Sequence, residues 1–92
     1  MSMFSDNIYI ESWCSMKLKY ADKYRKIGLK VSYYRKAAGI TQEQLAEKIN
    51  KATSYVGALE APNVDKALSF DAFFDIAEAL DVEPYKLLKD DE

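Results

Sequence analysis

The sequence predicts an all-α domain of five helices preceded by an N-terminal extension, on three observations. Apolar residues recur at steps of three and four through most of the chain, which is the spacing of one face of an α-helix. Helix-start and helix-stop signals alternate along it, and no segment shows a convincing strand pattern. The length of 92 residues, 49% of them hydrophobic and 30% charged, suits one folded core and leaves no room for a second.

The first predicted helix covers residues 22–38. One face of it carries Tyr24, Ile27, Val31, Tyr34 and Ala38. Gly39 follows where a left-handed C-terminal cap is needed, and Ile40 is the apolar residue that commonly folds back over such a cap. The helix is therefore expected to end at this glycine.

The second helix is predicted to begin directly after a capping box. In this motif the Thr41 hydroxyl accepts from the Gln44 amide while the Gln44 side chain reaches back, and Glu43 meets the positive end of the helix dipole. The inward residues are Leu45, Ala46 and Ile49. Asn50, which tolerates positive φ, arrives nine residues after the cap and predicts a short helix.

Proline residues delimit the last three helices. The third, over residues 53–60, buries Val56 and Leu59 and stops because Pro62 cannot continue a helix. A loop to about residue 68 leads to a fourth helix, capped by Ser69 and ended by Asp81-Val82. Its apolar set is Phe70, Phe73, Ile76, Ala77 and Leu80. Pro84 begins a short fifth helix, which carries Tyr85, Leu87 and Leu88.

The chain is thus divided into an extension over residues 1–21, a helical domain over 22–89 and an acidic tail over 90–92. In the extension, Tyr9, Trp13, Met16 and Tyr20 continue the apolar face of the first helix backward. This spacing fits an added helix, whereas Ile8-Tyr9-Ile10 equally fits an extended arm; periodicity alone does not choose between them.

Composition argues against an enzyme and against a membrane protein. The chain has no histidine and a single cysteine, Cys14, so the commonest general base and any cysteine-cluster metal site are missing. We expect no catalytic residue, metal, cofactor or small-molecule ligand. No apolar run reaches the roughly 18 to 20 residues of a membrane span, and the first sixteen residues lack the Lys or Arg of a signal peptide. A cytoplasmic location is expected.

Charge is divided along the sequence although the net charge is only −2. Residues 1–40 hold eight Lys and Arg against three Asp and Glu, whereas residues 41–92 hold five against twelve. The division fits charged helix faces that segregate by chance, and it also fits a basic patch that meets a polyanion.

Two short helices joined by a three-residue turn form a helix-turn-helix arrangement, which presents its second helix to a DNA major groove. The order and spacing of motifs over residues 24–89 resemble the Cro and phage-repressor type of this domain, the XRE family. The motifs are Ile27-Gly28, Arg35, Gly39-Ile40-Thr41-Gln42-Glu43-Gln44-Leu45-Ala46, Ser54-Tyr55-Val56, Leu59-Glu60, Ser69-Phe70, Ile76-Ala77, Leu80 and Leu87-Leu88.

The resemblance implies a five-helix fold whose third helix enters the major groove and whose second lies across the phosphates. It implies a partly buried ion pair between Arg35 and Glu60. By position, Thr41 and Gln42 would meet a phosphate, Thr53 and Ser54 would read base edges, and Tyr55 would face the DNA backbone. Tyr55 equally suits packing beside the second helix. Lys51, in the turn before the third helix, is expected to contact a phosphate.

Two positions depart from the family pattern. Gly57 and Ala58 are expected on the outward face of the third helix, where longer polar side chains are usual. Ala58 can touch a thymine methyl group, but residues 53–60 contain no Arg, Asn or Gln for a bidentate base contact. Ala61-Pro62 also replaces the glycine turn usual at this point. Specificity is therefore expected to depend on DNA shape or on the N-terminal arm.

The sequence thus favours a DNA-binding transcriptional regulator, a small repressor that acts as a homodimer on a palindromic site in double-stranded DNA. The alternative is a protein-interaction module or an antitoxin with a degenerate recognition helix. Two apolar groups are candidates for the dimer contact: Tyr9, Trp13 and Met16 in the extension, and Phe74, Tyr85 and Leu88 near the C-terminus. We expect the C-terminal group to form the contact, assisted by the arm, because the third helix must remain free.

Overall fold

The computed structural model describes residues 2–61 and 68–89, with side chains from residue 19 onward. Its helices are α1 (Ser2–Ala37), α2 (Gln42–Lys48), α3 (Thr53–Glu60), α4 (Phe70–Leu80) and α5 (Pro84–Leu88). The described residues contain no strand, so the predicted all-α class is confirmed. The acidic tail and the greater part of the predicted loop after α3, residues 62–67, lie outside the described residues, as do the side chains of Tyr9, Trp13 and Met16.

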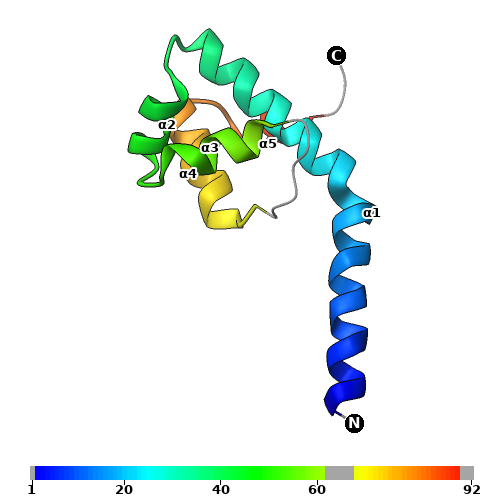
Figure 1. Cartoon of the computed structure of the whole chain (residues 1–92). Coiled ribbons are helices and arrows are strands. Elements are labelled where there is room, and N and C mark those ends of the chain that lie inside the picture. The colour runs from blue at the N-terminus through cyan, green and yellow to red at the C-terminus, as the bar shows by residue number, and fades with distance from the viewer. Residues whose placement is uncertain (1, 62–67, 90–92) are drawn as a thin grey trace.

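The first helix begins twenty residues earlier than residues 22–38 predicted. α1 is continuous from Ser2, so the extension is helical rather than an extended arm. No glycine or proline interrupts residues 2–21, and no start signal marks residue 22 more strongly than any before it. In Figure 1 the first half of α1 stands clear of the other helices, while its second half lies along the body that α2 to α5 form.

The caps that the sequence predicts around α2 are confirmed. The Thr41 hydroxyl accepts from the Gln44 amide at 3.0 Å, and the Gln44 side-chain oxygen accepts from the Thr41 amide at 2.8 Å. Gly39 has φ 75° and Asn50 has φ 60°, the left-handed geometry that ends α1 and α2. The turn from α1 into α2 is therefore specified by neighbouring residues.

The last two helices also follow local signals. The Ser69 hydroxyl accepts from the Ala72 amide at 3.1 Å, Asp81 ends α4 with φ 59°, and Pro84 begins α5. One predicted member of the buried face of α4 is wrong: Phe70 is 76% exposed. As the first residue of α4 it lies at the edge of the core, and its ring stacks on the exposed Phe74 instead, with 6.1 Å between the ring centroids.

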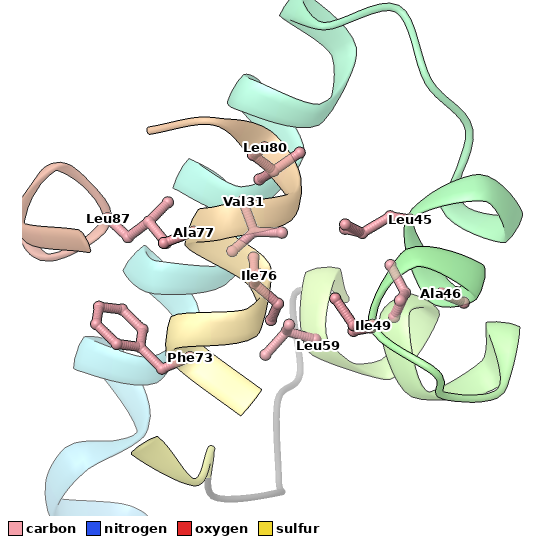
Figure 2. Close-up of a cluster of buried hydrophobic side chains, with 11 residues drawn as sticks. Val31, Leu45, Ala46, Ile49, Leu59, Phe73, Ile76, Ala77, Leu80 and Leu87 are labelled. Atoms are coloured by element: carbon pink, nitrogen blue, oxygen red, sulfur yellow. The ribbon is translucent and has the colours of Figure 1, made fainter. Parts of the chain in front are cut away.

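The core gathers at the meeting of all five helices. Figure 2 shows Val31 of α1 and Ile76 of α4 between the side chains of α2 and α3 and those of α5. The core cluster comprises Val31, Leu45, Ala46, Ile49, Val56, Leu59, Phe73, Ile76, Ala77, Leu80 and Leu87. These include every inward residue predicted for α2 and α3. On α1, Val31 is fully buried, whereas Ala38 lies beyond the helix end and is exposed.

Close contact between α1 and α3 depends on Gly28. A Cβ atom at this position would overlap the backbone carbonyl oxygen of Leu59, so the two helix backbones approach more closely than any side chain permits. This contact sets the position of α3 against the long helix.

Candidate DNA-binding surface

An ion pair joins the end of α1 to the end of α3. Arg35 Nε donates to Glu60 Oε2 at 2.8 Å, and Arg35 Nη2 donates to Glu60 Oε1 at 3.0 Å. Arg35 Nη1 also donates to the carbonyl oxygen of Ile40 at 2.8 Å. The two side chains are only 10% and 5% exposed, so this bidentate pair is largely removed from water.

The same carboxylate holds α2. Gln42 Nε2 donates to Glu60 Oε1 at 3.0 Å, so Glu60 accepts from α1 and from α2 together. The hydrogen bonds that Arg35 donates to Glu60, opposed by the effect of burial, raise the pKa of Arg35 further above its ordinary value. The arginine therefore stays charged at any ordinary pH, and the network keeps α1, α2 and α3 in one arrangement.

The contact between Gln42 and Glu60 was not predicted. The sequence assigned Gln42 only to a phosphate, because no periodic pattern connects residues eighteen positions apart. Gly57 lies beside the same side chain: a Cβ at position 57 would be 3.6 Å from Gln42 Oε1. Position 57 is therefore half-buried beside the start of α2, whereas Ala58 is exposed as expected.

The start of α3 is exposed while the rest of the helix is anchored. Thr53, Ser54 and Ala58 are exposed, whereas Val56 and Leu59 are buried in the core. Unlike α2 and α4, α3 has no side-chain cap, because Ala52 is its N-cap residue. The first amides of α3 therefore receive no hydrogen bond acceptor from the N-cap side chain.

A lysine precedes the N-cap residue of α3 in the chain. Lys51 Nζ is 5.1 Å from the centroid of the Tyr55 ring, within cation–π range. The ring is half-buried against the core, and this burial raises the pKa of the Tyr55 hydroxyl above its ordinary value. The structure therefore shows Tyr55 packed against the core, and its contact with the DNA backbone stays a prediction.

Comparisons with known proteins agree with this geometry. Residues 31–87, more than half of the chain, match the helix-turn-helix family. The chain belongs to the XRE-type helix-turn-helix family. A solved structure similar to this helix-turn-helix protein is that of the restriction-modification controller protein C.AhdI from Aeromonas hydrophila, with 32% sequence identity and a TM-score of 0.68. The match covers 74% of this chain and 96% of that one. No curated protein matches the chain.

As a member of this family, the protein is a DNA-binding transcription regulator. All eight residues that the sequence assigned to DNA or to the outward face of the third helix lie on α2, on α3 or at their N-terminal ends. Thr41, Lys51, Thr53, Ser54 and Ala58 are exposed there, and Gln42, Tyr55 and Gly57 are half-buried. Lys51 is the one cation among the eight.

The described part of the chain contains neither a cluster of metal-ligating residues nor a membrane-spanning helix. No three Cys, Asp or Glu residues there lie close enough together to hold a metal ion. Among the helices described, none is both long enough and apolar enough to cross a bilayer.

Proposed function

We propose that this helix-turn-helix protein is a sequence-specific repressor that binds a palindromic operator in double-stranded DNA as a homodimer. The observation that carries the proposal is the exposed start of α3, where Thr53 and Ser54 project from a helix whose other side is fixed in the core. The Arg35–Glu60–Gln42 network supports it, because a rigid pair of helices is what a groove-reading surface requires.

In the proposed complex α3 enters the major groove. The hydroxyls of Thr53 and Ser54 hydrogen-bond base edges, and Ala58 contacts a thymine methyl group. Lys51 and the N-terminal end of α2, where Thr41 and Gln42 lie, meet phosphates on either side. Short hydroxyls discriminate weakly among bases, so a single domain would bind its own site only slightly more tightly than it binds any other DNA. Non-specific binding of this kind has a dissociation constant of roughly 10⁻⁴ to 10⁻⁶ M.

A dimer discriminates better between the operator and other DNA, because two linked domains each contribute their own preference. The C-terminal group remains available for the contact: Phe74, Tyr85 and Leu88 are 52%, 59% and 56% exposed. Pairing there, assisted by the N-terminal half of α1, leaves α3 free and places the two recognition helices about 34 Å apart, one turn of DNA.

The similarity to a restriction-modification controller protein supports a regulatory rather than an architectural role for the DNA contact. Repression then requires no catalytic step and no cofactor, since occupancy of the operator excludes polymerase. Such a role also requires that the protein share a compartment with the DNA that it binds.

Selection of bound sites from random DNA, followed by gel-shift titration at two salt concentrations, tests the proposal. We expect a palindromic site and an affinity that falls steeply with salt, because Lys and Arg displace counterions from phosphates. Lys51→Ala should lower the affinity, and the matched control Lys86→Ala, on the exposed surface of α5, should not. Absence of a shift at every protein concentration would favour the interaction module.

A further inference from the structure

The projecting half of α1 continues the face that the other half buries. Val31 is fully buried in the core, and Ile27, Tyr24 and Tyr20 precede it at steps of four, three and four residues. Positions 16, 13 and 9 extend the same face and hold Met, Trp and Tyr. In a helix these seven positions lie on one narrow stripe, which we call the α1 stripe.

Among the described helices, α2 to α5 leave this half of α1 without a neighbour, and in Figure 1 it stands clear of them. Its stripe nevertheless holds Tyr9, Trp13 and Met16. An isolated helix of this length is marginal in water, because its stability comes largely from packing an apolar face. The projecting half therefore requires a partner.

A groove lies at the base of the projecting half. Tyr20, Tyr24 and Ile27 of α1 form it together with Leu88 of α5, and it encloses about 570 Å³. Asp22, Lys23 and Lys26 also line it, and Asp22 Oδ2 lies 3.5 Å from Lys26 Nζ. The α1 stripe thus runs from the projecting half directly into this groove, where Lys23 lies at the edge.

The charges of α1 indicate which partner fits. Residues 1–16 contain Asp6 and Glu11 and no Lys or Arg. Residues 17–36 contain a single acid, Asp22, and eight basic residues: Lys17, Lys19, Lys23, Arg25, Lys26, Lys30, Arg35 and Lys36. An acidic first half repels DNA phosphates, so it is unsuited to an arm that binds DNA. It complements the basic half of a second α1 that runs in the opposite direction.

One register of two paired α1 helices places apolar residues opposite one another and opposite charges opposite one another. If two α1 helices cross antiparallel about a two-fold axis between residues 14 and 15, position 9 lies opposite position 20 and position 13 opposite position 16. Four residues of the α1 stripe, Tyr9, Trp13, Met16 and Tyr20, then face one another across the axis. The same register sets Asp6, which also lies on this face, opposite Lys23 at the edge of the groove.

We propose that the N-terminal half of α1 is a self-association element, which pairs antiparallel with α1 of a second copy and ends in that copy's groove. A two-fold interface must be complementary to itself, and a stripe with an acid at one end and a base at the other meets this condition. The inference rests on the proposed homodimer and assigns its main contact to α1, in place of the C-terminal group Phe74, Tyr85 and Leu88.

Sedimentation equilibrium of the full chain at tens of micromolar tests the register. The wild type should be dimeric. Asp6→Lys and Lys23→Glu should each weaken dimerisation about tenfold, because each turns two symmetry-related ion pairs into repulsions. The double variant should return to within about threefold of wild type. Glu11→Lys, which makes the same charge change on the opposite face of the helix, should dimerise like the wild type.

Three outcomes would overturn the inference: a monomeric wild type, a double variant no tighter than the singles, or a Glu11→Lys variant as weak as Asp6→Lys. Circular dichroism shows whether the variants keep their helix content, and Lys23→Glu tests the pair from an exposed position far from the helix end. A gel shift on a single half-site separates this inference from the proposed function. A dimer that binds DNA but is unaffected by Asp6→Lys refutes only the α1 pairing, whereas a dimer that binds no DNA refutes only the proposed DNA-binding function. A monomeric wild type refutes the pairing together with the proposed dimer.

Discussion

Removal of one partner from the Arg35–Glu60 pair should destabilise the domain far more than loss of a surface ion pair would. Glu60→Ala leaves the Arg35 guanidinium in a site only 10% exposed, where the Ile40 carbonyl is its one remaining partner among the contacts described above. Arg35→Ala leaves the Glu60 carboxylate, 5% exposed, with the amide of Gln42. Each variant therefore retains a buried charge with most of its hydrogen bonds missing.

The size of the effect follows from this burial. Breaking a buried pair from one side costs about 3 to 5 kcal/mol, whereas exposed pairs contribute less than about 1 kcal/mol. Because each variant keeps one hydrogen bond to the remaining charge, we expect a loss at the lower end of this range, about 3 kcal/mol. In a domain of this size each kcal/mol lowers Tm by about 4 to 8 °C, so we expect a drop of at least about 12 °C.

Thermal unfolding followed by circular dichroism measures this directly. The double variant Arg35→Ala/Glu60→Ala should lose less stability than the two single losses added together, because the second substitution removes the isolated charge. Asp22→Ala is the matched control: it breaks an ion pair with Arg25 whose side chains are 60% and 42% exposed, and it should melt close to the wild type. If both buried single variants melt within about 4 °C of wild type, the pair does not hold α1 to α3 and the reasoning fails.

Three further predictions address packing, DNA contact and alkaline pH. Gly28→Ala should lower the free energy of unfolding by about 3 kcal/mol or more, because its Cβ meets the backbone of Leu59 rather than a side chain that can move; chemical denaturation measures it. Lys51→Ala should reduce the slope of log affinity against log salt concentration by about 1 for every DNA sequence, because it removes a phosphate contact. Ser54→Ala should instead change the preference at one base position by roughly 1 to 3 kcal/mol. Titrations against operator variants measure both effects, and if neither appears, α3 does not bind in the major groove. Burial keeps the Tyr55 hydroxyl protonated in the folded state, whereas in the unfolded chain it ionises at its ordinary pKa of 10.0. The free energy of unfolding should therefore decline as pH rises from 10.0 towards the raised pKa of the folded state. Urea unfolding at pH 9 and pH 11 measures this decline, which should be smaller in Tyr55→Phe.

The candidate surface was predictable in outline because its elements carry local signals. A cap such as Thr41 acts on an amide three residues away, and Gly39 or Asn50 ends a helix through its own φ angle. Such signals need no knowledge of the rest of the fold. They located α2, the turn and α3, and with them the exposed residues at the start of α3.

The sequence by itself therefore determined the helix order, the caps and most of the core, because these depend on periodicity and on neighbours within four residues. Only the tertiary structure decided that Gln42 binds Glu60, that position 57 faces α2 and that Gly28 lies against Leu59. Each of these contacts joins residues at least fifteen positions apart, whose meeting depends on how whole helices pack. The exposure of Phe70 has the same origin. Helical spacing places a residue on one face of a helix, but the neighbouring helices decide how far along that face residues are buried.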